Sequence, residues 1–223
     1  MNSYMFSLGG IELTALPSGA LWIAAERLLA VSDLHLGKSE RLARIGGALL
    51  PPYEVLETLD RLEAEISRLA PRVLVLLGDS FDDSAAVISL GNEVADRINR
   101  LSAGRHLIWI AGNHDPGPTE LPGTHLGMYR SGPLTFRHIA KTGAVPGEVS
   151  GHYHPKARLR IRGQFISRPC FLADRTRVIL PAFGTYTGGL DMTHPDVAKL
   201  LGPDAVVLMT GRRVTALPYG AAA

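Results

Sequence analysis

The stretch Val31-Ser32-Asp33-Leu34-His35-Leu36-Gly37-Lys38 places an aspartate and a histidine directly after the apolar run 28–31. A short apolar run of this kind predicts a buried strand, so both side chains are expected at its carboxyl end. In open α/β sheets, ligands bind outside the carboxyl ends of the strands. The stretch therefore predicts an α/β fold and the place of its functional site.

Three further polar clusters repeat this arrangement, each after an apolar, strand-like run. They are Leu77-Gly78-Asp79, Ala111-Gly112-Asn113-His114-Asp115 and Ser150-Gly151-His152-Tyr153-His154. Residues two apart in extended backbone point the same way, so a pair such as Asp33 with His35, or His152 with His154, can bind one ion, and the sheet edge can bring two pairs together. Clusters of Asp, Asn and His without Cys suit hard or borderline metal ions. Taken together, the four clusters predict a metal site, although a single Asp-x-His or Gly-Asp is weak evidence.

The pattern between the clusters predicts the rest of the fold. Helices are expected over 52–70, ended by Pro71, and over 84–101, between the apolar strands 28–31, 73–77 and 106–111. Residues 11–16 and 20–25 flank a Pro-Ser-Gly turn and predict an antiparallel pair.

The second half of the chain changes character after Pro116. Frequent Pro and Gly predict a long loop over the site, and only short strands follow. These strands are expected over 134–138, 149–150, 158–161, 168–172, 178–180, 205–209 and 214–217. Strand–helix units followed by strands predict two packed sheets with helices outside, in one domain over residues 1–223.

Composition sets the broad limits. With 223 residues and 46% hydrophobic residues the chain can bury a full core, and its net charge of +2 is too small to indicate nucleic-acid binding by itself. Cys170 is the only cysteine, so no intrachain disulfide can form and a reducing, cytoplasmic location is expected. The sequence has no run of 18 apolar residues, so no membrane contact is expected.

In their order, the clusters resemble the motifs of the calcineurin-like metallophosphoesterases: Asp-x-His, Gly-Asp, Gly-Asn-His-Asp, a lone His and Gly-His-x-His. The resemblance implies a four-layer αββα sandwich of two mixed sheets flanked by helices. It also implies two divalent ions. One would be held by Asp33, His35, Asp79 and His154, and the other by Asp79, Asn113, His138 and His152. Mn²⁺ is expected first, and Fe, Zn or Ni would accept the same ligands.

The resemblance gives two further residues a catalytic role. His114 would protonate or stabilise the leaving oxygen, and Asp115 would steady its imidazole. The lone histidine is His138 or His125, and His138 is favoured because it follows a strand-like run. Asp82 and Asp83 follow the shared Asp79 and are interpreted either as helpers at the rim or as a solvated helix start.

The chain resembles one subfamily more narrowly, the ligase-associated DNA damage response endonucleases. The likeness rests on residues 33–38, Pro51-Pro52, Pro169-Cys170-Phe171 and the Pro-Ala-Phe-Gly stretch within 180–189. It implies DNA phosphodiester hydrolysis in bacterial DNA repair, with association with a DNA ligase or repair helicase. The oligomeric state is left open.

The expected charge of the site also favours diesters. Two divalent ions with Asp33 and Asp79 would be neutralised by one hydroxide and one diester monoanion, whereas a monoester dianion would leave the site negative. Two basic pairs are candidate substrate phosphate contacts, Lys38 with Arg41 on a helix face and Arg158 with Arg160 on a strand face. Solvated faces explain each pair equally well.

Two other functions compete with the nuclease interpretation. One is a phosphatase or nucleotide hydrolase acting on small molecules. The other is a catalytically silent scaffold, which the presence of both Asn113 and His114 argues against.

Overall fold

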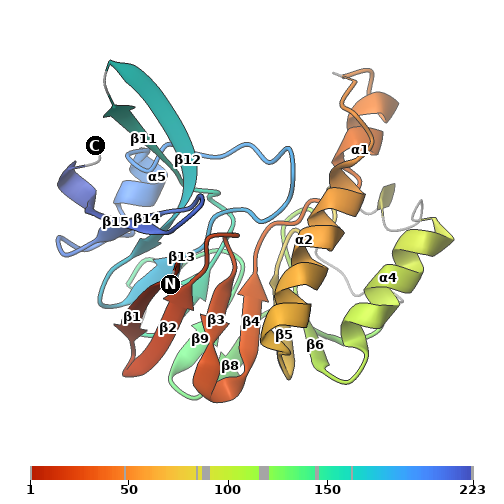
Figure 1. The fold of residues 1–223 in the computed structure, drawn as a ribbon, viewed down its shortest axis with the longest axis horizontal. Helices are drawn as coiled ribbons and strands as arrows, with labels where there is room; N and C mark the ends of the chain where they lie inside the picture. The colour runs from red at the N-terminus through yellow and green to blue at the C-terminus, as the bar shows by residue number, and fades with distance from the viewer. Residues whose placement is uncertain are drawn as a thin grey trace.

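The computed structural model describes residues 2–47, 49–83, 85–86, 91–115, 121–143, 146–161 and 163–221. Two mixed sheets lie face to face, and most of the helices cover the outer face of the first sheet (Figure 1). This arrangement confirms the expected α/β sandwich.

The first sheet has its strands in sequence order, which brings three motif-bearing strands side by side. The strands are β1 (Tyr4–Leu8), β2 (Ile11–Ala15), β3 (Leu21–Ile23), β4 (Leu28–Val31), β5 (Val73–Leu77), β6 (His106–Ile110) and β7 (Thr124–Leu126). Strands β1 to β4 pair antiparallel, whereas β4 to β7 pair parallel. The carboxyl ends of β4, β5 and β6 therefore meet at one edge, and the motif after each strand begins there.

The second sheet brings the remaining histidines to the same region. Its order is β15-β14-β12-β13-β10-β9-β8, and β11 pairs with β12 outside this path. The strands are β8 (Tyr129–Ser131), β9 (Leu134–Phe136), β10 (Glu148–Ser150), β11 (Lys156–Ile161), β12 (Gln164–Ala173), β13 (Arg177–Ile179), β14 (Val206–Met209) and β15 (Thr215–Pro218). Because β9, β10 and β13 are parallel, the histidines after β9 and β10 leave the sheet at one edge.

Three apolar clusters fill the layers. Leu13, Phe136 and Phe171 are among the fully buried side chains between the two sheets. Helices α2 (Glu54–Leu69) and α4 (Asn92–Ser102) pack residues such as Leu59 and Ile98 against the other face of the first sheet. The outer face of the second sheet is covered by the short α5 (Pro195–Ala198) and its neighbouring loops. The fourth layer is therefore much thinner than the first.

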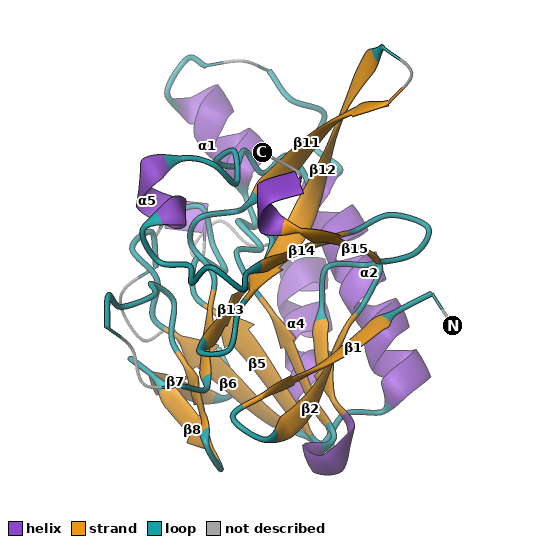
Figure 2. Ribbon diagram, turned by 90° about the vertical axis from the view of Figure 1, so that its left-hand side faces the viewer, coloured by secondary structure: helices purple, strands orange, loops and turns teal. Residues whose placement is uncertain are grey.

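Short elements complete the chain. Helix α1 (Lys38–Arg44) follows the first motif, and two 3-10 turns span η1 (Ala24–Glu26) and η2 (Tyr219–Ala221). In the described part of the chain, no helix has the length and apolar character needed to cross a bilayer. The β11–β12 hairpin extends beyond the body of the molecule (Figure 2).

Several expected boundaries were wrong. Helix α2 begins at Glu54, two residues after the expected start at Pro52. The expected helix over 84–101 is not continuous, because Gly91 is extended (φ −64°, ψ 154°) and α4 begins at Asn92. Residues 84 and 87–90 lie outside the described residues. The expected long loop after Pro116 contains β7 and β8, although residues 116–120 also lie outside the described part.

The two sheets are joined directly beneath the first motif. Ala182 forms a β-bridge with Ser32, the amide of Phe183 donates to Ser32 O (2.8 Å), and the amide of Gly184 donates to Asp33 O (3.1 Å). From the other side, the amide of Asp33 donates to Gly78 O (3.2 Å). The Pro-Ala-Phe-Gly segment thus holds the backbone at the end of β4.

Gly184 is required by this close approach. A Cβ at this position would lie 2.0 Å from the carbonyl oxygen of Leu34 and 3.0 Å from that of Asp33, both backbone atoms. We therefore expect Gly184→Ala to lower the free energy of unfolding by about 2 kcal/mol or more, as overpacking does. Urea unfolding measures the change.

Gly188→Ala is the matched control, because a Cβ there meets nothing within 4 Å. Its effect should stay within about 0.5 kcal/mol. Equal losses in the two variants would contradict the proposed close contact.

Candidate metal centre

The backbone that carries the motif side chains is left-handed at five non-glycine positions. The φ angles are 53° at Asp33, 46° at His35, 45° at Asp79, 73° at His152 and 45° at His154. Such residues are uncommon, and each costs about 1 kcal/mol or more unless surrounding contacts hold it. The expected extended backbone was therefore wrong for both the Asp33–His35 and the His152–His154 pairs.

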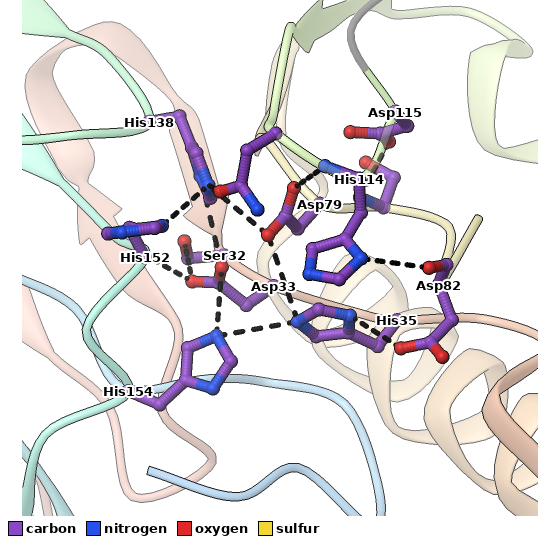
Figure 3. Close-up of polar contacts among 12 residues, drawn as sticks. Ser32, Asp33, His35, Asp79, Asp82, His114, Asp115, His138, His152 and His154 are labelled. Atoms are coloured by element: carbon purple, nitrogen blue, oxygen red, sulfur yellow. Dashed lines mark hydrogen bonds and ion pairs between the residues drawn. The ribbon is translucent and has the colours of Figure 1, made fainter. Parts of the chain in front are cut away.

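The polar side chains converge in two groups (Figure 3). Asp33, His35 and His154 form the first group, and Asp79, His138 and His152 form the second. Within each group, one ligand atom per residue lies within 4.8 Å of the others. Asp33 and His35 therefore stay together, whereas His152 and His154 point into different groups and do not grip one ion as a pair.

Asp79 lies between the two groups. Its Oδ2 is 3.3 Å from His138 Nε2 and 4.0 Å from His35 Nε2. A single carboxylate oxygen thus faces one histidine of each group, as a ligand shared by two ions would.

Each carboxylate is anchored through one oxygen. Asp33 Oδ2 accepts hydrogen bonds from Ser32 Oγ (2.5 Å) and the amide of His152 (3.0 Å). Its Oδ1 is buried, has no hydrogen-bond partner in the described part of the chain and lies 3.0 Å from His154 Nε2. Asp79 Oδ1 accepts from the amide of His114 (2.9 Å), which leaves Oδ2 facing the histidines. Each aspartate therefore keeps one oxygen for a cation.

Two imidazoles are oriented by contacts at Nδ1. His138 Nδ1 lies 3.0 Å from the carbonyl oxygen of Leu77, an acceptor, so the hydrogen is on Nδ1 and Nε2 offers a lone pair. His35 Nδ1 lies 2.9 Å from Asp82 Oδ1. Outer contacts of this kind fix the tautomer of metal-binding histidines.

Lone-pair atoms of the groups face one another at short distances. His35 Nε2 is 3.4 Å from His154 Nε2, and His138 Nε2 is 3.0 Å from Asn113 Oδ1 and 3.2 Å from His152 Nδ1. Burial opposes the charged form of His138, but the neighbouring Asp79 and Asp33 carboxylates raise its pKa. The cluster attracts positive charge, and its nitrogen and oxygen donors fit divalent ions such as Mn²⁺, Fe²⁺ or Zn²⁺.

The motif glycines make room for these side chains. A Cβ at Gly112 would lie 2.1 Å from Asp79 Oδ1, one at Gly151 would lie 1.7 Å from Ser32 Oγ, and one at Gly78 would lie 2.4 Å from His138 Nδ1. Any larger residue would displace a side chain of the centre. The glycines in Gly-Asp, Gly-Asn-His-Asp and Gly-His-x-His thus have a steric reason.

The two candidates for the lone histidine lie in different places. His138 is buried in the second group, whereas His125 lies on β7 and stacks on Trp109 with ring centroids 5.8 Å apart. The favoured choice of His138 agrees with this geometry.

The expected support of His114 by Asp115 was wrong. His114 Nδ1 instead lies 3.0 Å from the backbone oxygen of Asp82. Asp115 Oδ2 accepts from the amides of Ser80 (2.7 Å) and Phe81 (3.2 Å), so it fixes the loop after β5. Burial raises the pKa of Asp115 to about 6.

The sequence left two interpretations of Asp82 open, a helper at the rim of the site or part of a solvated helix start, and the structure places it beside the site. Its side chain is 1% exposed, which excludes a solvated helix start, and it contacts His35 Nδ1 and Arg41 Nε (2.5 Å). Burial opposes ionisation, but His35 and Arg41 lower the pKa of Asp82 to about 2. Asp83 is half-buried and pairs with Arg44 instead (2.6 Å).

The two predicted pairs of substrate contacts lie in different parts of the molecule. Lys38 Nζ lies 3.9 Å from Asp82 Oδ1, and Arg41 is bound to the same carboxylate, so both partly neutralise a buried charge. Arg158 and Arg160 are exposed on β11.

A cavity of about 260 Å³ opens beside the second group. It is lined by Asn113 and His138 together with Arg137 and Lys141. These two cations were missed, and the adjacency of Arg137 and Lys141 to His138 in the sequence is the signal that could have identified them.

Comparisons with known proteins agree with this geometry. The family model described as calcineurin-like phosphoesterase matches residues 26–142, more than half of the chain. A solved structure titled "Crystal structure of Pseudomonas putida nuclease MPE" is similar over 97% of this chain and 100% of that chain, with 26% identity and a TM-score of 0.73.

A structure of Yfce, a phosphoesterase from E. coli, is 15% identical, covers 86% of this chain and 98% of that chain, and has a TM-score of 0.40. No curated protein matches the sequence. The matched segment contains the motifs after β4, β5, β6 and β9, and the chain belongs to the calcineurin-like phosphoesterase family, whose members are metal-dependent phosphoesterases.

Proposed function

We propose that this chain is a binuclear phosphodiesterase that cuts DNA as an endonuclease in bacterial DNA repair, with Mn²⁺ as its first-choice metal. The position of Asp79 between the two groups carries the binuclear part of the proposal. Similarity to a nuclease over nearly the whole chain supports the nucleic-acid substrate. A cytoplasmic location and association with a DNA ligase or repair helicase rest on the sequence resemblance.

The metal ligands follow from the two groups. Asp33, His35 and His154 would hold one ion, Asn113, His138 and His152 would hold the other, and Asp79 would contact both. When bound, two such ions activate water and stabilise negative charge on the phosphoryl oxygens. Asp33 and Asp79 offset only part of their charge, which suits a diester monoanion.

His114 is the proposed general acid. Because Nδ1 faces a backbone oxygen, it must carry a hydrogen, and Nε2 is the atom that can give a proton to the leaving oxygen. After donation the imidazole stays in the Nδ1–H tautomer, which the carbonyl of Asp82 continues to hold. The backbone amide of His114 meanwhile anchors Asp79.

Asp82 would position both histidines. Its carboxylate contacts His35 Nδ1, its backbone oxygen contacts His114 Nδ1, and Arg41 balances its buried charge. It touches neither metal position and acts only through these neighbours.

A comparison of two substrates tests the proposed reaction. With Mn²⁺ supplied, we expect hydrolysis of bis-p-nitrophenyl phosphate to exceed that of p-nitrophenyl phosphate. Asp79→Asn should abolish both activities, because it removes the shared charge. Preference for the monoester would indicate a phosphatase, and no turnover with several metals would indicate a silent scaffold.

Asp82→Asn tests the positioning role. Loss of an outer-shell partner typically costs about 10- to 100-fold in metal affinity or activity, so we expect Mn²⁺ affinity measured by titration calorimetry to fall in that range. Asp83→Asn is the matched control, since its side chain is 33% exposed, against 1% for Asp82, and pairs with Arg44 and not with a histidine of the centre. Similar affinities for the two variants would exclude the assigned role of Asp82.

A further inference from the structure

The β11–β12 hairpin concentrates positive charge. Residues 156–173 contain five Lys or Arg and no Asp or Glu, whereas the rest of the chain has 18 basic and 21 acidic residues. The hairpin is therefore a local basic feature in a chain whose net charge is only +2.

The strand register places the basic side chains on one face. Lys156 pairs with Pro169, Arg158 with Ser167 and Arg160 with Phe165. Side chains of directly paired residues share a face, so the three cations of β11 lie on the same face as Phe165.

At the base of the hairpin, the opposite face is packed against the protein, whereas Ile166 farther along that face is 36% exposed. Ala157 and Cys170 belong to this face and are fully buried in the outer apolar cluster. The basic face is accordingly turned outward, and Arg158 and Arg160 are exposed.

Phe165 is a large apolar side chain that is exposed to solvent. It is 61% exposed, and the guanidinium carbons of Arg158 and Arg160 lie 4.3 and 5.9 Å from its ring centroid. An exposed aromatic ring beside guanidinium groups is a surface on which unpaired bases stack.

The same face continues into a cavity of about 460 Å³ at the base of the hairpin. Lys156, Ser167 and Pro169 line it together with Arg61 and Arg168, and none of the described residues that line it is acidic. Gly184 also lines this cavity and donates its amide to Asp33 O (3.1 Å), so the cavity adjoins the backbone that carries the metal centre.

One carboxylate lies near the base of the hairpin. Asp191 forms a β-bridge with Lys156, and its Oδ1 accepts from the amide (3.0 Å) and hydroxyl (2.7 Å) of Thr193. The hydrogen bonds from Thr193 lower the pKa of Asp191 and Arg158 also helps to lower it, so Asp191 offsets part of the charge of Arg158. Arg160 and Phe165 lie farther along the face, toward the tip of the hairpin.

We infer that this face of the hairpin is a docking surface for an unpaired strand of the nucleic-acid substrate. Lys156, Arg158 and Arg160 contact phosphates, and a base stacks on Phe165. A duplex can use the cations, but its base faces are covered, so it cannot use Phe165. The inference rests on the proposed nucleic-acid substrate and deepens it.

Binding of labelled DNA to the metal-free, full-length protein tests the inference. Fluorescence anisotropy compares a single-stranded oligonucleotide with the duplex of the same sequence. We expect Phe165→Ala to weaken single-strand binding about tenfold and to leave duplex binding unchanged. Phe165→Trp, which keeps a stacking ring, should restore binding.

Removal of the charges should act differently. Arg158→Ala with Arg160→Ala should weaken both DNA forms and reduce the salt dependence of single-strand binding by about 1.4 logarithmic units per tenfold change in salt. Arg175→Ala is the matched control, because its side chain is 88% exposed at the opposite end of β12. Arg175→Ala should also hydrolyse bis-p-nitrophenyl phosphate like the wild type.

Two results would overturn the inference. One is an equal effect of Phe165→Ala on both DNA forms, or none on either. The other is a wild-type protein that hydrolyses the small diester but binds no DNA. A protein that hydrolyses no phosphoester would instead defeat the proposed function, while the metal-free binding assay would still decide the role of the hairpin.

Discussion

The centre depends on the contact between the two sheets at Ser32 and Asp33. Here the amides of Phe183 and Gly184 bind the backbone, and Ser32 Oγ and the amide of His152 bind the Asp33 carboxylate. Ligands from β4 and β10 can meet only because the sheets approach so closely. Gly151 and Gly184 permit this approach, since a Cβ on either would overlap the facing chain. The left-handed backbone at five motif residues is one cost of the arrangement, and these backbone contacts hold it.

A second constraint is the burial of charge beside the centre. Asp82 is nearly inaccessible, and an isolated buried carboxylate would be unfavourable. His35 and Arg41 compensate for it, and helix α1 brings Arg41 into place directly after the first motif. Asp82 also contacts His114 Nδ1 through its backbone oxygen. Asp82, in the loop after β5, therefore links two neighbouring segments. Its carboxylate binds Arg41 of helix α1, and its backbone oxygen contacts His114 in the loop after β6.

The sequence predicted the features that depend on local pattern. Apolar runs identified β4, β5 and β6, and the ordered clusters identified the residues that the structure gathers in two groups. Features that depend on distant contacts were missed. The backbone at His152 and His154 is left-handed and not extended, and the two side chains enter different groups. The contacts of Asp82 with His35 and of Asp115 with the amides of Ser80 and Phe81 were not predicted, because the sequence does not reveal which groups the loop after β5 brings together. Strands of three residues, such as β7 and β8, are too short to have a recognisable period.

Anomalous diffraction from crystals grown with Mn²⁺ tests the binuclear site most directly, because it locates each ion independently of activity. We expect two anomalous peaks, one at Asp33, His35 and His154 and one at Asp79, His138 and His152, with Asp79 in contact with both ions. A single peak, or peaks away from these two groups, would contradict it.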